Sequence, residues 1–135
     1  MALGTYRPLY GQTKIVQLKC AATAVNEGEI CKTVTAMVKA GDTSTVGAVG
    51  IAAANIAASG TGPFYLDGVF VAPLVGTPAL APGDLVYSAT DGVDDGSMSD
   101  KSIGYVVDVD PPATAGTPVT FLFTSSLLCP LTTHA

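Results

Sequence analysis

Short apolar runs separated by proline and glycine constrain the fold of this chain most. The clearest example is residues 65–87 (YLDGVFVAPLVGTPALAPGDLVY), where apolar runs at 69–72 and 85–87 are joined by a connection that ends in a turn at 81–84. Runs this short, interrupted by turn-forming residues, are typical of β-strands. Fifteen Gly, nine Pro and few strong helix formers extend the same pattern to the whole chain. The sequence therefore predicts an all-β fold.

The expected strands follow from alternation of apolar and polar residues. Residues 14–20 and 30–38 alternate clearly and are predicted to pair as a hairpin, and a strand is expected at 43–51, followed by a helical turn or loop at 52–58. Further strands are expected at 65–72, 85–89, 103–109 and 119–123, with one apolar face at Ile103, Tyr105, Val107 and Val109. The segments 60–63, 90–101 and 110–118 are predicted loops. We expect a small β-barrel or sandwich of about seven to eight short strands with an extended N-terminal arm.

The length of 135 residues is that of a single domain. Residues 1–13 show no repeating period and are predicted to form the N-terminal arm. Residues 14–124 are expected to form a single β domain, and residues 125–135 a C-terminal tail that packs on the domain or on a neighbour through its leucines. Neither an internal repeat nor a linker divides the chain.

Charge and hydropathy limit the classes of partner. Only 13% of the residues are charged while 48% are hydrophobic, so we expect part of the surface to be covered by other copies or by another protein. The net charge of −5 argues against a nucleic-acid partner, which needs clustered Lys and Arg, and equally against an acidic membrane surface. The apolar window at 46–58 is too short for a spanning helix, and residues 1–10 lack the continuous apolar segment of a secretory signal.

Three cysteines, Cys20, Cys31 and Cys129, leave at least one thiol unpaired. Cys20 and Cys31 could face each other across the predicted hairpin, but buried free thiols are the ordinary outcome for such residues. The cysteine usage indicates assembly in a reducing compartment.

The residue inventory argues against an enzyme. The single histidine, His134, stands next to the last residue, so a nucleophile with a histidine base is close to excluded, and no cofactor motif occurs. A zinc site would need all three cysteines and His134 without the usual paired spacing. Residues 91–100 carry four aspartates, but alignment with an EF-hand places Val93 and Ser102 at ligand positions, so that motif fails. We predict no catalytic residue, no metal site and no cofactor.

One short cluster in the arm indicates a partner. Tyr and Arg are enriched where proteins dock on each other, and the arm places both types next to apolar residues. The alternative is a frayed terminus. The candidate partner-binding residues are Tyr6, Arg7, Pro8, Leu9 and Tyr10.

Residues 49–123 also resemble a family of phage capsid cement, or head decoration, proteins. The matching features are the Gly50-Ile51-Ala52 segment, the Ala-rich corner at 55–60, LDGVF at 66–70, PGDLVY at 82–87, IGYV at 103–106 and the final strand at 119–123. The arm and the Cys-containing first hairpin depart from the family's general pattern, and the loop at 91–100 is long for it.

This resemblance implies a structural virion protein on the outer surface of the icosahedral capsid, assembled in the host cytoplasm. It implies a homotrimer that binds the major capsid protein and stabilises the joints between its subunits. Deletion of residues 1–10 would then weaken capsid attachment and leave the domain folded. The alternatives are a β-sandwich module that binds carbohydrate or calcium through residues 91–100, and a hydrolase with an unrecognised site.

Overall fold

The fold is all-β, as predicted from the sequence. A computed structural model describes residues 4–35, 37–41, 43, 46–109 and 114–128. Within these residues it contains eleven strands and no helix, so more strands form than the seven or eight expected. Accordingly, this part of the chain holds no helix long and apolar enough to cross a membrane. The bounds of the strands are β1 Arg7–Tyr10, β2 Ile15–Lys19, β3 Ile30–Val34, β4 Met37–Ala40, β5 Gly50–Ala52, β6 Thr61–Tyr65, β7 Asp67–Pro73, β8 Leu85–Ala89, β9 Gly92–Asp94, β10 Ser102–Val109 and β11 Pro118–Thr124.

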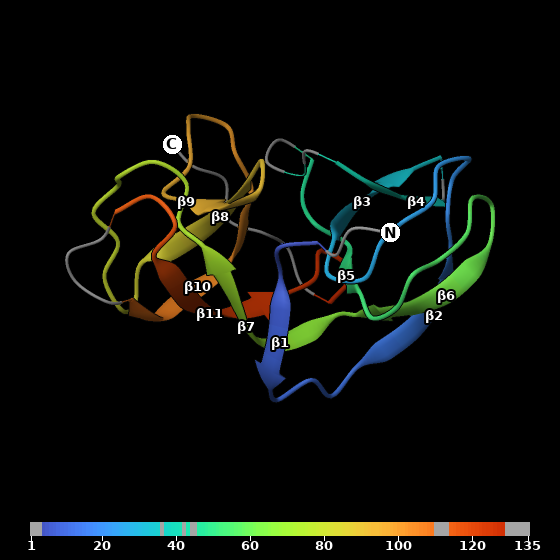
Figure 1. Cartoon of the computed structure of the whole chain (residues 1–135), viewed down its shortest axis with the longest axis horizontal. Helices are drawn as coiled ribbons and strands as arrows, with labels where there is room; N and C mark the ends of the chain where they lie inside the picture. Colours follow the sequence, from blue (N-terminus) through green and yellow to red (C-terminus); the bar gives the residue numbers. More distant parts are fainter. Residues whose placement is uncertain (1–3, 36, 42, 44–45, 110–113, 129–135) are drawn as a thin grey trace.

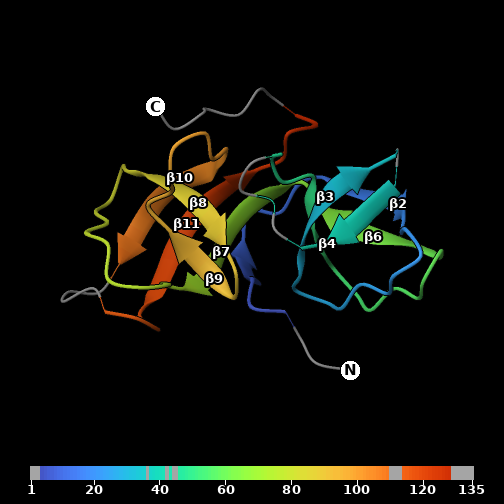
Figure 2. The same cartoon turned by 90° about the horizontal axis from the view of Figure 1, so that it is seen from above.

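The strands form two antiparallel sheets that are sandwich-like and do not close into a barrel. The large sheet has the order β1-β7-β11-β10-β8-β9, and the small sheet has the order β2-β6-β5-β3-β4. Figure 1 shows the two sheets side by side along the longest axis, and the view from above in Figure 2 agrees. Only Leu66 separates β6 from β7, so the chain passes directly from one sheet into the other.

The predicted hairpin between residues 14–20 and 30–38 is wrong. β2 pairs with β6, and the second segment folds back on itself as the hairpin β3-β4, with Thr35 at φ 47° in the connection. Alternation predicted both strands because it reports which side chains share a face, but it does not report the pairing partner.

β6 was missed because Gly62 and Pro63 suggested a loop. The glycine is needed here for packing, since a Cβ at position 62 would lie 2.4 Å from Cγ1 of Ile56. The backbone of β6 therefore approaches the small core closely, as glycine in a strand often permits.

Two hydrophobic cores lie in the molecule. The large core covers the inner face of the large sheet and extends to Ile30, Ala48 and Ile51, so that it spans the junction between the sheets. The small core lies within the small sheet and contains both Cys20 and Cys31. The two apolar runs at 69–72 and 85–87 therefore contribute mainly to the large core, through Phe70, Ala72 and Val86.

Residues 90–101 are more ordered than the predicted solvated loop. Gly92–Asp94 forms β9, which pairs with β8, and Val93 is fully buried in the large core. The predicted turn at 81–84 is confirmed, because the Asp84 amide donates to the Ala81 carbonyl and Gly83 takes φ 93°.

The expected strand at 43–51 is wrong in extent, because among its described residues strand begins only at Gly50. The start of the tail is packed, with Ser125 fully buried and its hydroxyl donating to the Val49 carbonyl. Cys129 and His134 lie outside the described residues. The division into an arm, a domain and a tail stays a prediction.

Candidate partner-binding surface

Tyr6 lies in the large core. Its side chain is 3% exposed, its hydroxyl donates to the Gly92 carbonyl oxygen at 2.6 Å, and its ring meets Phe121 edge to face at 6.0 Å. Burial, together with the Asp94 carboxylate, raises the pKa of Tyr6 well above its ordinary value. The tyrosine that sequence analysis assigned to the partner-binding cluster thus holds the start of β1 to the domain.

The other four residues of the cluster, Arg7, Pro8, Leu9 and Tyr10, form β1 and are exposed. β1 is the edge strand of the large sheet and pairs with β7. Their role in partner binding stays a prediction. Because deletion of residues 1–10 would remove a sheet strand and the buried Tyr6, we now expect it to disturb the domain itself.

Tyr10 belongs to a continuous apolar row on the outer face of the large sheet. The registers place Leu85 opposite Tyr105, Tyr105 opposite Leu122, Leu122 opposite Val69, and Val69 opposite Tyr10. Directly opposed residues in antiparallel strands share a face and have Cβ atoms about 5 Å apart. We call these five side chains, on five adjacent strands, the apolar row.

Three of the five side chains of the apolar row are open to solvent, while Leu85 is half-buried and Val69 is only 8% exposed. Tyr10 is 61% exposed, Tyr105 53% and Leu122 44%, and the neighbouring Val107 is 44% exposed. Exposed apolar groups are normal singly, but a contiguous set that crosses a sheet marks an interaction surface. The two tyrosines combine a large apolar area with a hydroxyl, which favours them at protein interfaces.

The sequence analysis missed most of this surface. It placed Ile103, Tyr105 and Val107 on one face of a regular strand, whereas Ile103 and Val106 are buried and Tyr105 and Val107 are exposed. The register of β10 shifts between Ser102 and Gly104 and again between Val106 and Asp108. Such irregularities break the two-residue period on which the prediction depended.

A second row runs beside the apolar row. It contains Arg7, Val71, Thr120 and Asp108, which pair in that order across β1, β7, β11 and β10. The outer face therefore carries the apolar row and, beside it, a second row with the cation of Arg7 at one end and the carboxylate of Asp108 at the other.

A groove of about 430 Å³ opens next to Arg7. Its walls include Val71, Ala72 and Pro73 of β7 and Pro118 of β11, together with Gly4 and Thr5. The groove is thus continuous with the outer face of the large sheet through Arg7 and Val71.

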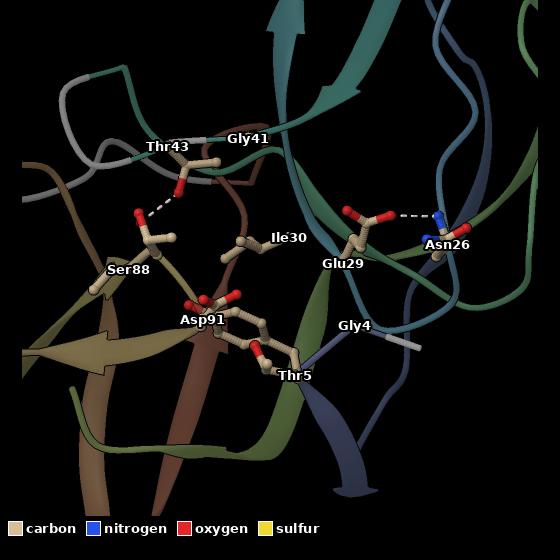
Figure 3. A pocket seen from close by; sticks show the side chains of 12 residues that line it. Gly4, Thr5, Asn26, Glu29, Ile30, Gly41, Thr43, Ser88 and Asp91 are labelled. Atoms are coloured by element: carbon tan, nitrogen blue, oxygen red, sulfur yellow. Dashed lines mark hydrogen bonds between the residues drawn. The ribbon is translucent and has the colours of Figure 1, made fainter. Parts of the chain in front are cut away.

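A separate cleft of about 320 Å³ lies between the two sheets (Figure 3). Glu29 from the small-sheet side and Asp91 from the β8-β9 turn are its charged lining residues. The hydroxyls of Thr43 and Ser88 bond to each other, and Glu29 Oε1 accepts from the Asn26 amide at 2.6 Å. The described lining therefore contains no nucleophile placed against a base.

The acidic segment at 91–100 uses two of its carboxylates locally. Asp94 accepts from the Gly96 amide at 2.9 Å and Asp100 accepts from the Ser97 amide at 2.7 Å. Within the described part of the chain, no group of three or more His, Cys, Asp or Glu side chains could hold a metal ion.

Cys20 and Cys31 are both buried free thiols. Burial raises the pKa of both, and the nearby Glu29 carboxylate adds to the effect on Cys31, so both thiols stay protonated at neutral pH. Of the two outcomes considered from sequence, the structure confirms free thiols.

Comparison with known proteins agrees with the resemblance noted from sequence. No curated protein matches the chain significantly. A sequence model described as phage cement protein matches residues 12–122, which is most of the chain and includes β2 to β10 and most of β11. The chain therefore belongs to the phage cement protein family.

Proposed function

We propose that this chain binds the outside of the icosahedral capsid and stabilises the joints between major capsid protein subunits. Membership of the cement family supports a structural role in the virion and an association with the capsid. The observation that carries the finer proposal is the apolar row, which gives the large sheet a surface suited to a protein partner.

In this proposal the chain acts by binding alone and catalyses no reaction. A protein that binds the assembled shell across a subunit joint, and binds free subunits less well, stabilises the shell by mass action. The low charge of the chain suits this role because few charged groups must be desolvated when the surface is covered.

The oligomeric state is part of the proposal. We infer a homotrimer, as the resemblance implies, and a closed ring of this kind needs two different patches in each contact. One further group of exposed apolar side chains away from the apolar row is Val46, Leu127 and Leu128. They come from two segments that meet, since the Ser126 amide donates to the Ala48 carbonyl.

The test is binding to expanded shells assembled from the major capsid protein of the same phage without this chain. We expect cosedimentation with the shells and a higher melting temperature of the decorated shells. The double variant Tyr105→Ser, Leu122→Ser should bind at least about 30-fold more weakly, since central interface residues cost about 2 kcal/mol or more.

The matched control is Ile15→Ser, because Ile15 is a strand residue of the small sheet with a similar exposure of 54%. It should fold and bind as the unaltered chain does. Failure of the unaltered chain to bind shells would overturn the proposed function. Normal binding by the folded double variant would instead show that the partner contacts another surface.

A further inference from the structure

The groove beside Arg7 combines an apolar floor with one cation. Val71, Ala72, Pro73 and Pro118 supply apolar walls, and Arg7 supplies a guanidinium with five N–H donors. This composition differs from the cleft between the sheets, where the charged lining residues are two carboxylates.

Arg7 makes no ion pair with any residue that the structure describes. Its guanidinium is therefore available to a carboxylate from outside the described part of the chain. A guanidinium matches a carboxylate in shape and can hold it with two parallel hydrogen bonds. Arg7 is the one cationic side chain in the described lining of the groove, whereas a polyphosphate ligand needs several cations.

The position of the groove connects it with the apolar row. Arg7 pairs with Val71, and two residues away on β7 lies Val69, a member of the row. A partner segment that covers the row can therefore place a neighbouring side chain in the groove, where that side chain contacts the apolar walls and the Arg7 guanidinium.

The edge of the sheet favours side-chain docking over addition of a strand. Pro8 stands in the middle of the edge strand β1 and has no N–H to offer to an added strand. A register shift between Pro8 and Tyr10 interrupts the edge further. The face and the groove are thus better suited to a partner than the edge of the sheet is.

We propose that the Arg7 groove binds a carboxylate of the major capsid protein, an Asp or Glu side chain that lies next to apolar residues covering the apolar row. This inference rests on the proposed function and adds the chemistry of the contact. Arg7 sets both the affinity and part of the salt dependence of attachment.

The experiment compares shell binding by three variants of Arg7, which is exposed and can be changed without opening the core. Arg7→Gln should weaken binding about tenfold, Arg7→Glu should weaken it further, and Arg7→Lys should restore part of the loss. Raising the salt concentration should weaken the unaltered chain more than Arg7→Gln, because only the former uses the ion pair.

The matched control is Lys19→Glu, which makes the same change of charge at an exposed strand residue of the small sheet. It should bind shells within about twofold of the unaltered chain. A set of Asp→Lys and Glu→Lys substitutions on the outer surface of the capsid protein should include one that restores binding of Arg7→Glu.

Normal shell binding by Arg7→Glu would overturn the inference and leave the proposed function intact. Absence of binding by the unaltered chain would instead overturn the proposed function. Sedimentation of the free chain tests whether a second copy of the chain occupies the groove instead. If Arg7→Glu dissociates the oligomer, and the oligomer of this variant that can still be isolated binds shells as well as the unaltered oligomer does, the groove holds a second copy and the inference is wrong.

Discussion

The two sheets of this molecule bury different cores and expose different faces. The large core contains Tyr6, Phe70, Phe121 and Phe123, whose rings meet at centroid distances of 5.7 to 6.4 Å. The small core has one aromatic residue, Phe64, among small aliphatic side chains and two thiols. The large sheet also carries the apolar row, whereas the exposed positions of β2 are one apolar residue, Ile15, and two polar ones, Gln17 and Lys19.

This difference indicates that the two sheets have different roles, with the proposed docking surface on the large sheet. The large sheet packs contacting aromatic rings behind its exposed apolar face, and a preorganised surface favours docking. The small sheet packs against the end of the large core and contributes less aromatic area. Four predictions test this contrast, beginning with the largest expected effect.

Phe121→Ala should destabilise the fold by about 3–5 kcal/mol, at the upper end for core truncations. The ring is fully buried and touches Tyr6 and Phe70, so its removal leaves a cavity among large rigid neighbours. Phe64→Ala should cost less because its smaller neighbours can close in. Denaturant unfolding measures both, and an equal or larger loss for Phe64→Ala would contradict the contrast.

Gly62→Ala should cost about 1–3 kcal/mol through overpacking of the small core. The added methyl would meet the Ile56 side chain, which must shift. A double variant with Ile56→Ala should lose less stability than the sum of the two single variants, since the clash is removed. Additive losses would show that the close approach of β6 is not the cause.

Tyr6→Phe should cost about 1–2 kcal/mol, because the buried Gly92 carbonyl loses its donor while the ring stays in place. Tyr10→Phe is the matched control, and its hydroxyl is on an exposed side chain, so thermal unfolding should hardly change. Equal stability of the two variants would argue against the role of Tyr6 as the residue that ties β1 to the core.

Asp67 should give a small pH dependence of about 1 kcal/mol or less. Partial burial raises its pKa, but hydrogen bonds from Thr13 and Lys14 lower it more, so the pKa in the folded state lies below its ordinary value. The stabilisation is therefore complete above the unfolded pKa and is lost as the pH falls through the folded pKa.

The measurement is the melting temperature between neutral pH and about pH 3, the region where a carboxyl with a lowered pKa titrates. Asp67→Asn should flatten part of the acid-side decrease seen in the unaltered chain. An unchanged slope in that variant would assign the decrease to other carboxylates.

Part of the candidate surface was accessible from sequence. The Tyr and Arg of the arm suggested a partner, and Arg7 and Tyr10 do lie on the exposed face of the large sheet. Tyr6 carried the same signal but is buried, since side-chain type does not say which way a residue of a strand points. Leu122 and Tyr105 gave no signal because apolar residues in strands are ordinarily buried.

The sequence by itself determined the all-β class, the turn at 81–84 and the short apolar segments, because glycine, proline and alternation act on neighbouring residues along the chain. It also carried enough of the cement family's pattern for the family to be recognised. Turns and strand-forming segments depend on neighbouring residues, and the family pattern depends on the order of short segments along the chain.

Only the tertiary structure decided which strands pair and which apolar side chains remain outside. β2 pairs with β6, 42 or more residues further along the chain, and backbone hydrogen bonds do not distinguish one strand from another. The register shifts in β10 then turned Tyr105 toward solvent and Val106 toward the core. Pairing and register emerge when the whole core is packed, and they created the apolar row from residues on five separate strands.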